Sequence, residues 1–119
     1  MAAKSIQRTT AVLRERGWPY QIVERHFNGL TYDMFGFIDL VTISPGGIIG
    51  IQACSPGTHQ EHKRKILENE NAPDWAKWAK IEIWTWRKLQ IKPHSKKLKW
   101  QPHIEEITNN MFDTPPHQA

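Results

Sequence analysis

The sequence predicts an α/β domain in which a small central mixed β-sheet is flanked by helices. Three observations support this class. An amphipathic helical pattern precedes the strand-like segments, two apolar runs flank a Pro-Gly-Gly turn at residues 45–47, and two short helical segments precede a further alternating strand. A chain of 119 residues forms one domain. We place this domain at residues 1–113 and expect a C-terminal tail at 114–119.

The first half of the chain predicts a helix and the start of the sheet. Residues 3–17 place Ile6, Thr10 and Leu13 on one helical face, and Gly17 is a typical stop. Residues 20–27 alternate like a strand, and the Asn-Gly pair that follows is the strongest turn signal in the chain.

The central segment predicts a hairpin that is buried on both faces. Residues 34–43 and 47–54 are apolar runs separated by the Pro-Gly-Gly turn, which is typical of strands covered on both sides. Residues 59–68 and a segment beginning near Pro73 predict two helices, and we expect Trp75 and Trp78 in the core.

The last part of the chain predicts two more strands. Residues 80–87 alternate, with Trp84 and Trp86 on one face, so that one of these rings is expected in the core and the other is free to stack on a ligand. Residues 88–97 form a basic connection, and residues 98–107 predict an edge strand, where Pro102 is tolerated because no partner needs its missing N–H.

The net charge of +4 is concentrated in one region. Residues 77–100 contain eight basic side chains and one acid, Glu82, and tryptophans are interleaved among them. Such a segment suits a phosphate backbone, and the alternative is a solvated surface. One cysteine excludes an internal disulfide, no apolar run is long enough to span a membrane, and the N-terminus lacks the apolar segment of a signal peptide. An intracellular protein is therefore expected.

Two polar residues interrupt the apolar hairpin strands. Asp39 and Gln52 stand where apolar residues are expected, and a buried carboxylate needs a hydrogen bond, a cation or a metal. In the simplest register the two side chains face each other across adjacent strands. Two converging oxygen ligands are typical of a magnesium site, although a lone buried aspartate is often only structural.

The order of a helix, a strand, a strand with aspartate, a tight turn and a strand with Gln-x-Cys resembles the PD-(D/E)XK nuclease superfamily, in particular small phage-type and Holliday-junction resolvase-like nucleases. The segments that carry the resemblance are residues 32–40, 50–54 and 83–88. The resemblance implies a restriction-endonuclease-like core, in which Asp39 and Gln52 bind Mg²⁺ or Mn²⁺. Cys54 stands where the family has its catalytic lysine. A lysine of the next helix is expected to replace it, with Lys65 preferred over Lys63.

Further residues are candidates for the same site. Glu15, Glu24 and Asp33 are additional acids, each with a structural alternative; Asp33 lies about 20 Å from Asp39 along an ideal strand unless Gly36 permits a bulge. A zinc site is disfavoured because Cys-x4-His-x2-His matches no common spacing. The residues expected to contact the DNA backbone are Lys63, Arg87, Lys88, Lys96, Lys97 and Lys99.

These observations predict a metal-dependent endonuclease that cuts DNA phosphodiester bonds. Nothing in the sequence indicates base recognition, so selection by DNA structure is expected, and the resemblance implies branched DNA and a phage or prophage origin. A homodimer paired through the C-terminal edge strand is expected by the same resemblance. The alternatives are an inactive nucleic-acid-binding module on the same fold and a partner protein that uses its tryptophans as interface anchors.

Overall fold

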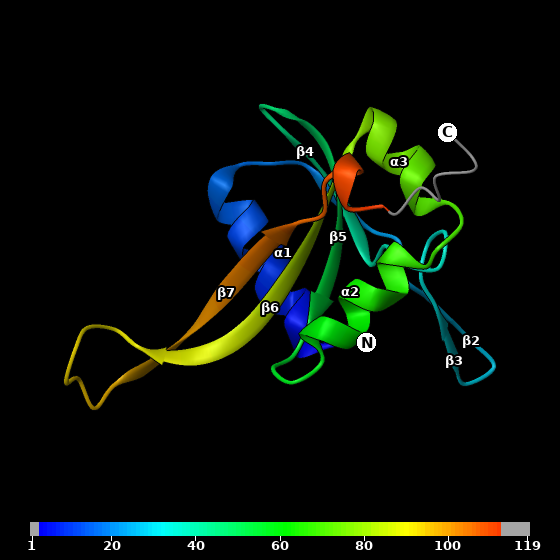
Figure 1. Ribbon diagram of the computed structural model, residues 1–119. Helices are drawn as coiled ribbons and strands as arrows, with labels where there is room; N and C mark the ends of the chain where they lie inside the picture. Colours follow the sequence, from blue (N-terminus) through cyan, green and yellow to red (C-terminus); the bar gives the residue numbers. More distant parts are fainter. Residues whose placement is uncertain (1–2, 113–119) are drawn as a thin grey trace.

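The computed structural model describes residues 3–112, so the tail expected at 114–119 lies outside the described residues. Its centre is a five-stranded mixed sheet in the order β1-β4-β5-β6-β7 (Figure 1). The β5–β6 pair is parallel and the other neighbours are antiparallel. The strands are β1 (Tyr20–Ile22), β4 (Leu40–Ser44), β5 (Gly47–Cys54), β6 (Lys80–Gln90) and β7 (Leu98–Glu106). The predicted α/β class with a central mixed sheet is confirmed.

Three α-helices in the described part of the chain cover the sheet: α1 (Lys4–Arg16), α2 (His59–Leu67) and α3 (Ala72–Trp78). Helix α1 lies on one face, and α2 and α3 lie on the other (Figure 1). Two separate apolar clusters reflect this arrangement. Ile6 and Leu13 pack with Ile51 under α1, whereas Ile66 packs with Ile83 under α2. A short 3₁₀ helix, η1 (Asn109–Met111), follows β7.

Helix α1 has the boundaries that the sequence predicts. Its buried residues recur at helical spacing and include Ile6 and Leu13. Gly17 ends it in the left-handed conformation, at φ 76°, and its N–H donates to the Arg14 carbonyl. The helix thereby covers one face of the sheet that carries the candidate site.

The predicted strand at 20–27 divides into two strands of different sheets. Strand β1 joins the central sheet, whereas β2 (Arg25–Phe27) pairs with β3 (Leu30–Tyr32) in a separate two-stranded hairpin. The N–H groups of Val23 and Glu24 both donate to the Asp39 carbonyl, and these two hydrogen bonds to one acceptor turn the chain away from β4. The predicted turn is confirmed, with positive φ at Asn28 and Gly29.

The predicted strand at 34–43 was wrong over its first half. Only β4 is extended, and residues 34–38 form a tight loop in which Met34 bridges to Ile38. Phe35 and Gly36 adopt positive φ, which reverses the chain. Phe37 and Ile38 are fully buried. Their apolar character therefore reflects burial in a loop and not strand structure.

Strands β6 and β7 run well beyond the sheet. The predicted connection at 88–97 is partly strand, because β6 continues to Gln90 and β7 begins at Leu98, and together they form a projecting arm (Figure 1). Strand β7 is an edge strand that contains Pro102, as predicted.

Two sequence expectations about the tryptophans were wrong. Trp78 is 89% exposed, so its placement in the core was wrong: α3 ends there and only Trp75 turns toward the core. Trp84 and Trp86 are both buried under α1, so neither ring is free to stack on a ligand. Within residues 3–112 no helix has the length and apolar character to cross a membrane.

Candidate metal centre

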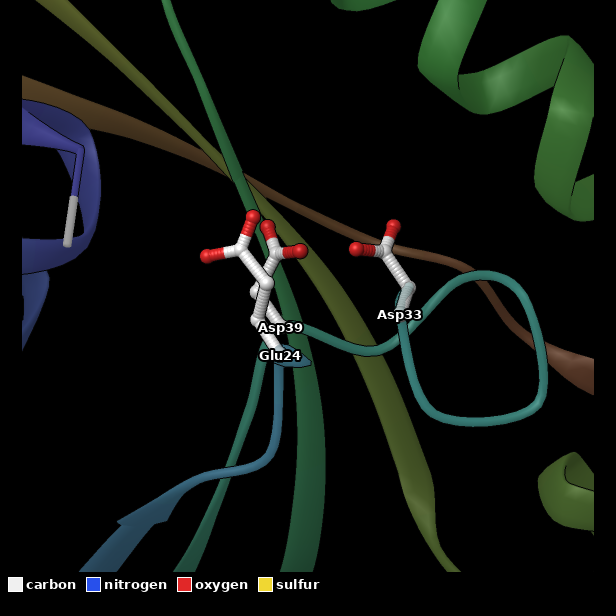
Figure 2. A group of neighbouring side chains, drawn as sticks. All are labelled: Glu24, Asp33 and Asp39. Atoms are coloured by element: carbon white, nitrogen blue, oxygen red, sulfur yellow. The ribbon is translucent and has the colours of Figure 1, made fainter. Parts of the chain in front are cut away.

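Three carboxylates meet at the base of the β2–β3 hairpin, next to the start of β4. Glu24, Asp33 and Asp39 each offer an oxygen, and these oxygens lie within 4.8 Å of one another (Figure 2). Glu24 precedes β2, Asp33 follows β3, and Asp39 precedes β4. The loop at 34–38 brings Asp33 back to Asp39, so these residues are neighbours despite their separation along an ideal strand.

Asp39 and Gln52 face each other, as the strand register predicted. The Gln52 Nε2 donates to Asp39 Oδ2 at 2.7 Å, and the Ala53 backbone N–H donates to the same oxygen at 2.9 Å. Both side chains are buried. Two donors on one oxygen hold the Asp39 carboxylate in a fixed orientation.

The other end of the Gln52 amide is unsatisfied. Its Oε1 is buried and has no hydrogen-bond partner among the described residues. Reversing the amide would place Oε1 against Asp39 Oδ2, which already accepts from the Ala53 N–H, so two acceptors would meet; this favours the observed orientation. A buried acceptor without a partner costs about 1–3 kcal/mol, and a hard cation is a ligand that would satisfy it.

The acidic cluster opens into one cavity of about 520 Å³. Its lining includes the three carboxylates, Gln52 and Lys65. Burial, followed by the charge of Asp33, raises the pKa of Asp39 to about 8. Burial and Asp33 also raise the pKa of Glu24. Carboxylates that repel one another in a shared cavity gain from a divalent cation between them, which would favour their ionised forms.

The raised pKa of Asp39 predicts how the metal-free protein responds to pH. The folded state binds the Asp39 proton more tightly than the unfolded state, whose pKa is near 3.8, so this stabilisation is complete at acid pH. It is lost as pH rises toward about 8. In chelator, the free energy of unfolding from urea denaturation should therefore fall across this window.

The matched measurement uses Asp39→Asn, which has no such proton to lose. The free energy of unfolding of this variant should therefore fall less with rising pH than that of the wild type. Identical pH profiles for the wild type and this variant would contradict the assignment of the raised pKa to Asp39.

Lys65 reaches the acidic cluster from α2. Its Nζ lies 3.3 Å from Asp33 Oδ2, and its stem lines the same cavity. His62, one turn earlier, also lines the cavity, and its Nδ1 is buried without a hydrogen-bond partner among the described residues. Burial and the nearby Lys65 lower the pKa of His62. Sequence reasoning considered His62 only for zinc; its i,i+3 spacing from Lys65 was the signal that the two share a helix face.

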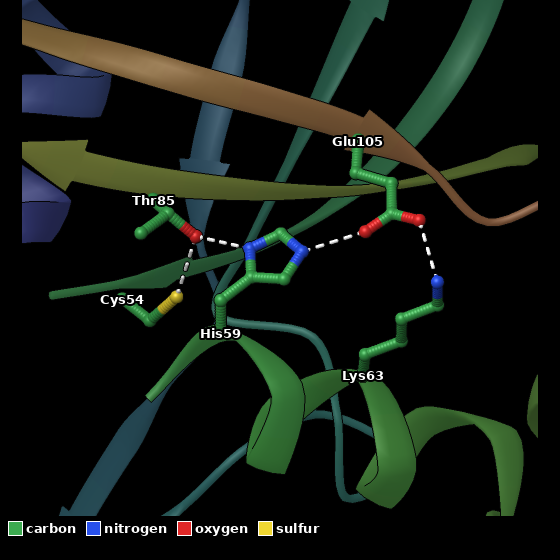
Figure 3. A network of polar contacts seen from close by, with 5 residues as sticks. All are labelled: Cys54, His59, Lys63, Thr85 and Glu105. Carbon is green, nitrogen blue, oxygen red and sulfur yellow. Dashed lines mark hydrogen bonds and ion pairs between the residues drawn. The ribbon is translucent and has the colours of Figure 1, made fainter. Parts of the chain in front are cut away.

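Lys63 lies in a different environment on the same helix (Figure 3). Its Nζ donates to Glu105 Oε2 at 2.8 Å, and His59 Nε2 lies 2.6 Å from Glu105 Oε1. Burial raises the pKa of Glu105, but hydrogen bonds from Lys63 and His59 outweigh this effect, so that the pKa of Glu105 lies below its ordinary value. The expectation that Lys63 is the alternative lysine of the cavity is not supported, because an ion pair holds it beside β7.

Cys54 belongs to the same polar network and not to the carboxylate cavity. A carboxylate oxygen can only accept, so His59 Nε2 donates to Glu105, and His59 Nδ1 lies in hydrogen-bond contact with the Thr85 hydroxyl at 2.5 Å. The same hydroxyl lies 3.1 Å from the Cys54 Sγ, in hydrogen-bond contact. Since His59 and Cys54 are engaged in this chain, the structure gives no support to zinc binding by the two.

The remaining sequence candidates lie outside the cavity. Glu15 is exposed on α1 and is not part of the acidic cluster. The basic arm, which we define as residues 87–101, carries Arg87, Lys88, Lys96, Lys97 and Lys99. At its root, the Arg8 guanidinium lies 3.7 Å from the centre of the Trp100 ring. Arginine and aromatic side chains therefore lie next to the lysines of the arm.

Comparison with known proteins gives no match: no protein-family model, no curated protein and no solved structure is similar to this chain. The resemblance to the PD-(D/E)XK superfamily stays a hypothesis. Function must therefore be inferred from the residues of the cavity and the arm.

Proposed function

We propose that this protein is a metal-dependent nuclease that hydrolyses DNA phosphodiester bonds, built on a restriction-endonuclease-like core. The observation that carries the proposal is the cavity that holds three converging carboxylates, the unsatisfied Gln52 Oε1 and a lysine. Oxygen ligands of this kind suit Mg²⁺ or Mn²⁺.

The ligands for such an ion come from four positions of the chain. Asp39, Glu24 and Asp33 would supply carboxylate oxygens, and Gln52 its amide oxygen. A bound Mg²⁺ or Mn²⁺ polarises a phosphoryl oxygen and lowers the pKa of a coordinated water. The Gln52 and Ala53 donors keep Asp39 oriented, which reduces the reorganisation needed when substrate binds.

Lys65 would supply the positive charge that the superfamily obtains from its motif lysine. Its ammonium group is half-exposed at the edge of the cavity and contacts a carboxylate through a single oxygen. From this position it can bind a phosphate oxygen and orient the attacking water. Cys54 cannot do so, because its thiol is buried against Thr85.

The basic arm is the proposed contact for the DNA backbone. Its lysines neutralise phosphates without reading bases, which favours selection by DNA structure, with branched DNA as the proposed substrate. We also propose a homodimer paired along β7, since this strand forms one edge of the sheet. Sedimentation velocity tests this proposal, because a homodimer has twice the mass of a single chain.

A second candidate is a nucleic-acid-binding module without catalysis, and the buried Cys54 at the lysine position favours it. Supercoiled plasmid incubated with Mg²⁺ or Mn²⁺, beside a gel shift in chelator, separates the two. Metal-dependent nicking supports the nuclease. Salt-sensitive binding without nicking supports the module, and the absence of both refutes both proposals.

Removing charge from the arm should change the salt dependence of binding. For the triple variant Lys96→Ala, Lys97→Ala and Lys99→Ala we expect the slope of log affinity against log salt to fall by about one unit for each phosphate that the arm no longer neutralises. Affinity should fall to the same extent for all DNA sequences.

The control for the arm removes two exposed cations elsewhere, Arg64 on α2 and Lys77 on α3, which pair with Glu68 and Asp74. Fluorescence anisotropy over a salt series measures both slopes. An unchanged slope in the triple variant would show that the arm is only a solvated surface.

A further inference from the structure

The hairpin formed by β2 and β3 connects two of the cavity carboxylates. Glu24 immediately precedes β2, and Asp33 immediately follows β3. The hairpin therefore projects directly from the candidate metal centre, on the opposite side of the molecule from the basic arm (Figure 1). At the hairpin tip, Phe27 is three residues after Glu24, and Leu30 is three residues before Asp33.

The tip of this hairpin is apolar and exposed. All six strand residues are exposed, and the two strands form a sheet of their own. Phe27 and Leu30 form the cross-strand pair that flanks the turn, and they are 63% and 58% exposed. An isolated two-stranded hairpin gains nothing from exposing a phenylalanine and a leucine side by side at its tip, which indicates a binding role.

The exposed surface is continuous with the cavity. Tyr32 and Asp33 line both the carboxylate cavity and a groove of about 660 Å³ beside the hairpin. Phe27 and Arg25 line the same groove, so a cation stands among the apolar side chains. A ligand that offers both phosphates and apolar ring faces matches this combination, and nucleic acid is such a ligand.

We propose that the β2–β3 hairpin is a DNA wedge, in which Phe27 and Leu30 insert at a base step beside the scissile phosphate. The inference rests on the proposed function, because it requires DNA at the carboxylate cavity. A two-stranded ribbon fits a DNA groove, and apolar side chains that enter a base step partly unstack it.

The wedge specifies the class of DNA that binds best. Unstacking costs least where pairing is already disturbed, as at a mismatch, a branch or a single-stranded junction. The hairpin thus supplies selection by structure with no base-reading residue. The groove beside it, lined by apolar side chains and Arg25, is the place where a displaced base would be received.

The test measures base unstacking in chelator, where no cutting occurs. A mismatched duplex carries 2-aminopurine beside the mismatch, and a second duplex carries it one helical turn away. The wild type should raise the fluorescence several-fold at the mismatch only. Phe27→Ala with Leu30→Ala should abolish this rise and bind the mismatched duplex about tenfold more weakly, as expected when the side chains that stack on a base are removed.

The matched control removes another exposed apolar pair beside a turn. Ile43 and Ile48 pair across the β4–β5 hairpin and are 56% and 47% exposed. Their double alanine variant should behave as the wild type. Circular dichroism checks that both variants fold. In the wild type, comparing 2-aminopurine fluorescence beside the mismatch with that one helical turn away tests the wedge without any variant.

The outcomes separate the wedge from the nuclease. Unstacking at the mismatch without metal-dependent cutting supports the wedge and refutes the nuclease. Cutting without unstacking, or an equal rise with the Phe27 and Leu30 variant, refutes the wedge alone. A wild-type dimer that this variant converts to a monomer would also refute the wedge, since the tip would then bind a second copy of the chain.

Discussion

Asp39→Asn should reduce metal-dependent cutting by about 10³-fold or more, because stabilisation of the transition state by a bound cation is worth several kcal/mol. The substitution keeps the size of the side chain and removes its charge. Initial rates of plasmid nicking in Mg²⁺ and in Mn²⁺ measure the loss. Calorimetric titration with Mn²⁺ should show weaker metal binding by the same variant.

The loss from Asp39→Asn should not come from unfolding. With a pKa of about 8, Asp39 is largely protonated in the metal-free protein at neutral pH, so a neutral asparagine changes the charge of the cavity little. The asparagine oxygen can still accept from the Gln52 and Ala53 donors. We therefore expect the thermal midpoint in chelator at neutral pH to be close to that of the wild type.

The control for Asp39 is Asp74→Asn. Asp74 is an exposed acid on α3 that pairs with Lys77 on the same helix, and this variant should cut at the wild-type rate. Wild-type cutting by Asp39→Asn would refute the metal centre. A loss shared with Asp74→Asn would indicate a general effect of charge on DNA binding.

The pairing of Asp39 with Gln52 could be predicted because two local rules agree. Each residue interrupts an apolar run of the sequence, and a short turn fixes the register of the hairpin that joins them. This register places Asp39 opposite Gln52, and the two side chains are in contact at 2.7 Å. Helix α1 could be predicted for a similar reason, since its apolar spacing and its terminal glycine indicate the same boundaries.

The full acidic cluster could not be predicted, because it depends on a loop. The apolar run extends the predicted strand back to Met34, which places Asp33 far from Asp39, whereas the positive φ values at Phe35 and Gly36 reverse the chain. Apolar residues 37 and 38 gave no sign of this, since burial and not strand structure sets their character. Glu24 depends in turn on the chain leaving β1 at the Asp39 carbonyl.

Lys65→Ala should reduce cutting by about 10²–10⁴-fold while leaving DNA affinity nearly unchanged, because a positioned group acts on the transition state and a single phosphate contact contributes little to binding. The control is Lys63→Ala on the same helix. That change removes an ammonium group that pairs with Glu105 in the structure, outside the carboxylate cavity.

Single-turnover rates at saturating protein separate the chemical step from binding, and anisotropy in chelator measures affinity. The structure predicts a large rate loss for Lys65→Ala and a small one for Lys63→Ala, with Lys65→Arg restoring part of the rate because it keeps the charge. The reverse order would assign the positioning role to Lys63 and would require its ion pair with Glu105 to break when DNA binds. If both alanine variants cut as the wild type does, the attacking water is oriented without a lysine of α2, and the contact between Lys65 and Asp33 serves only to balance charge in the cavity.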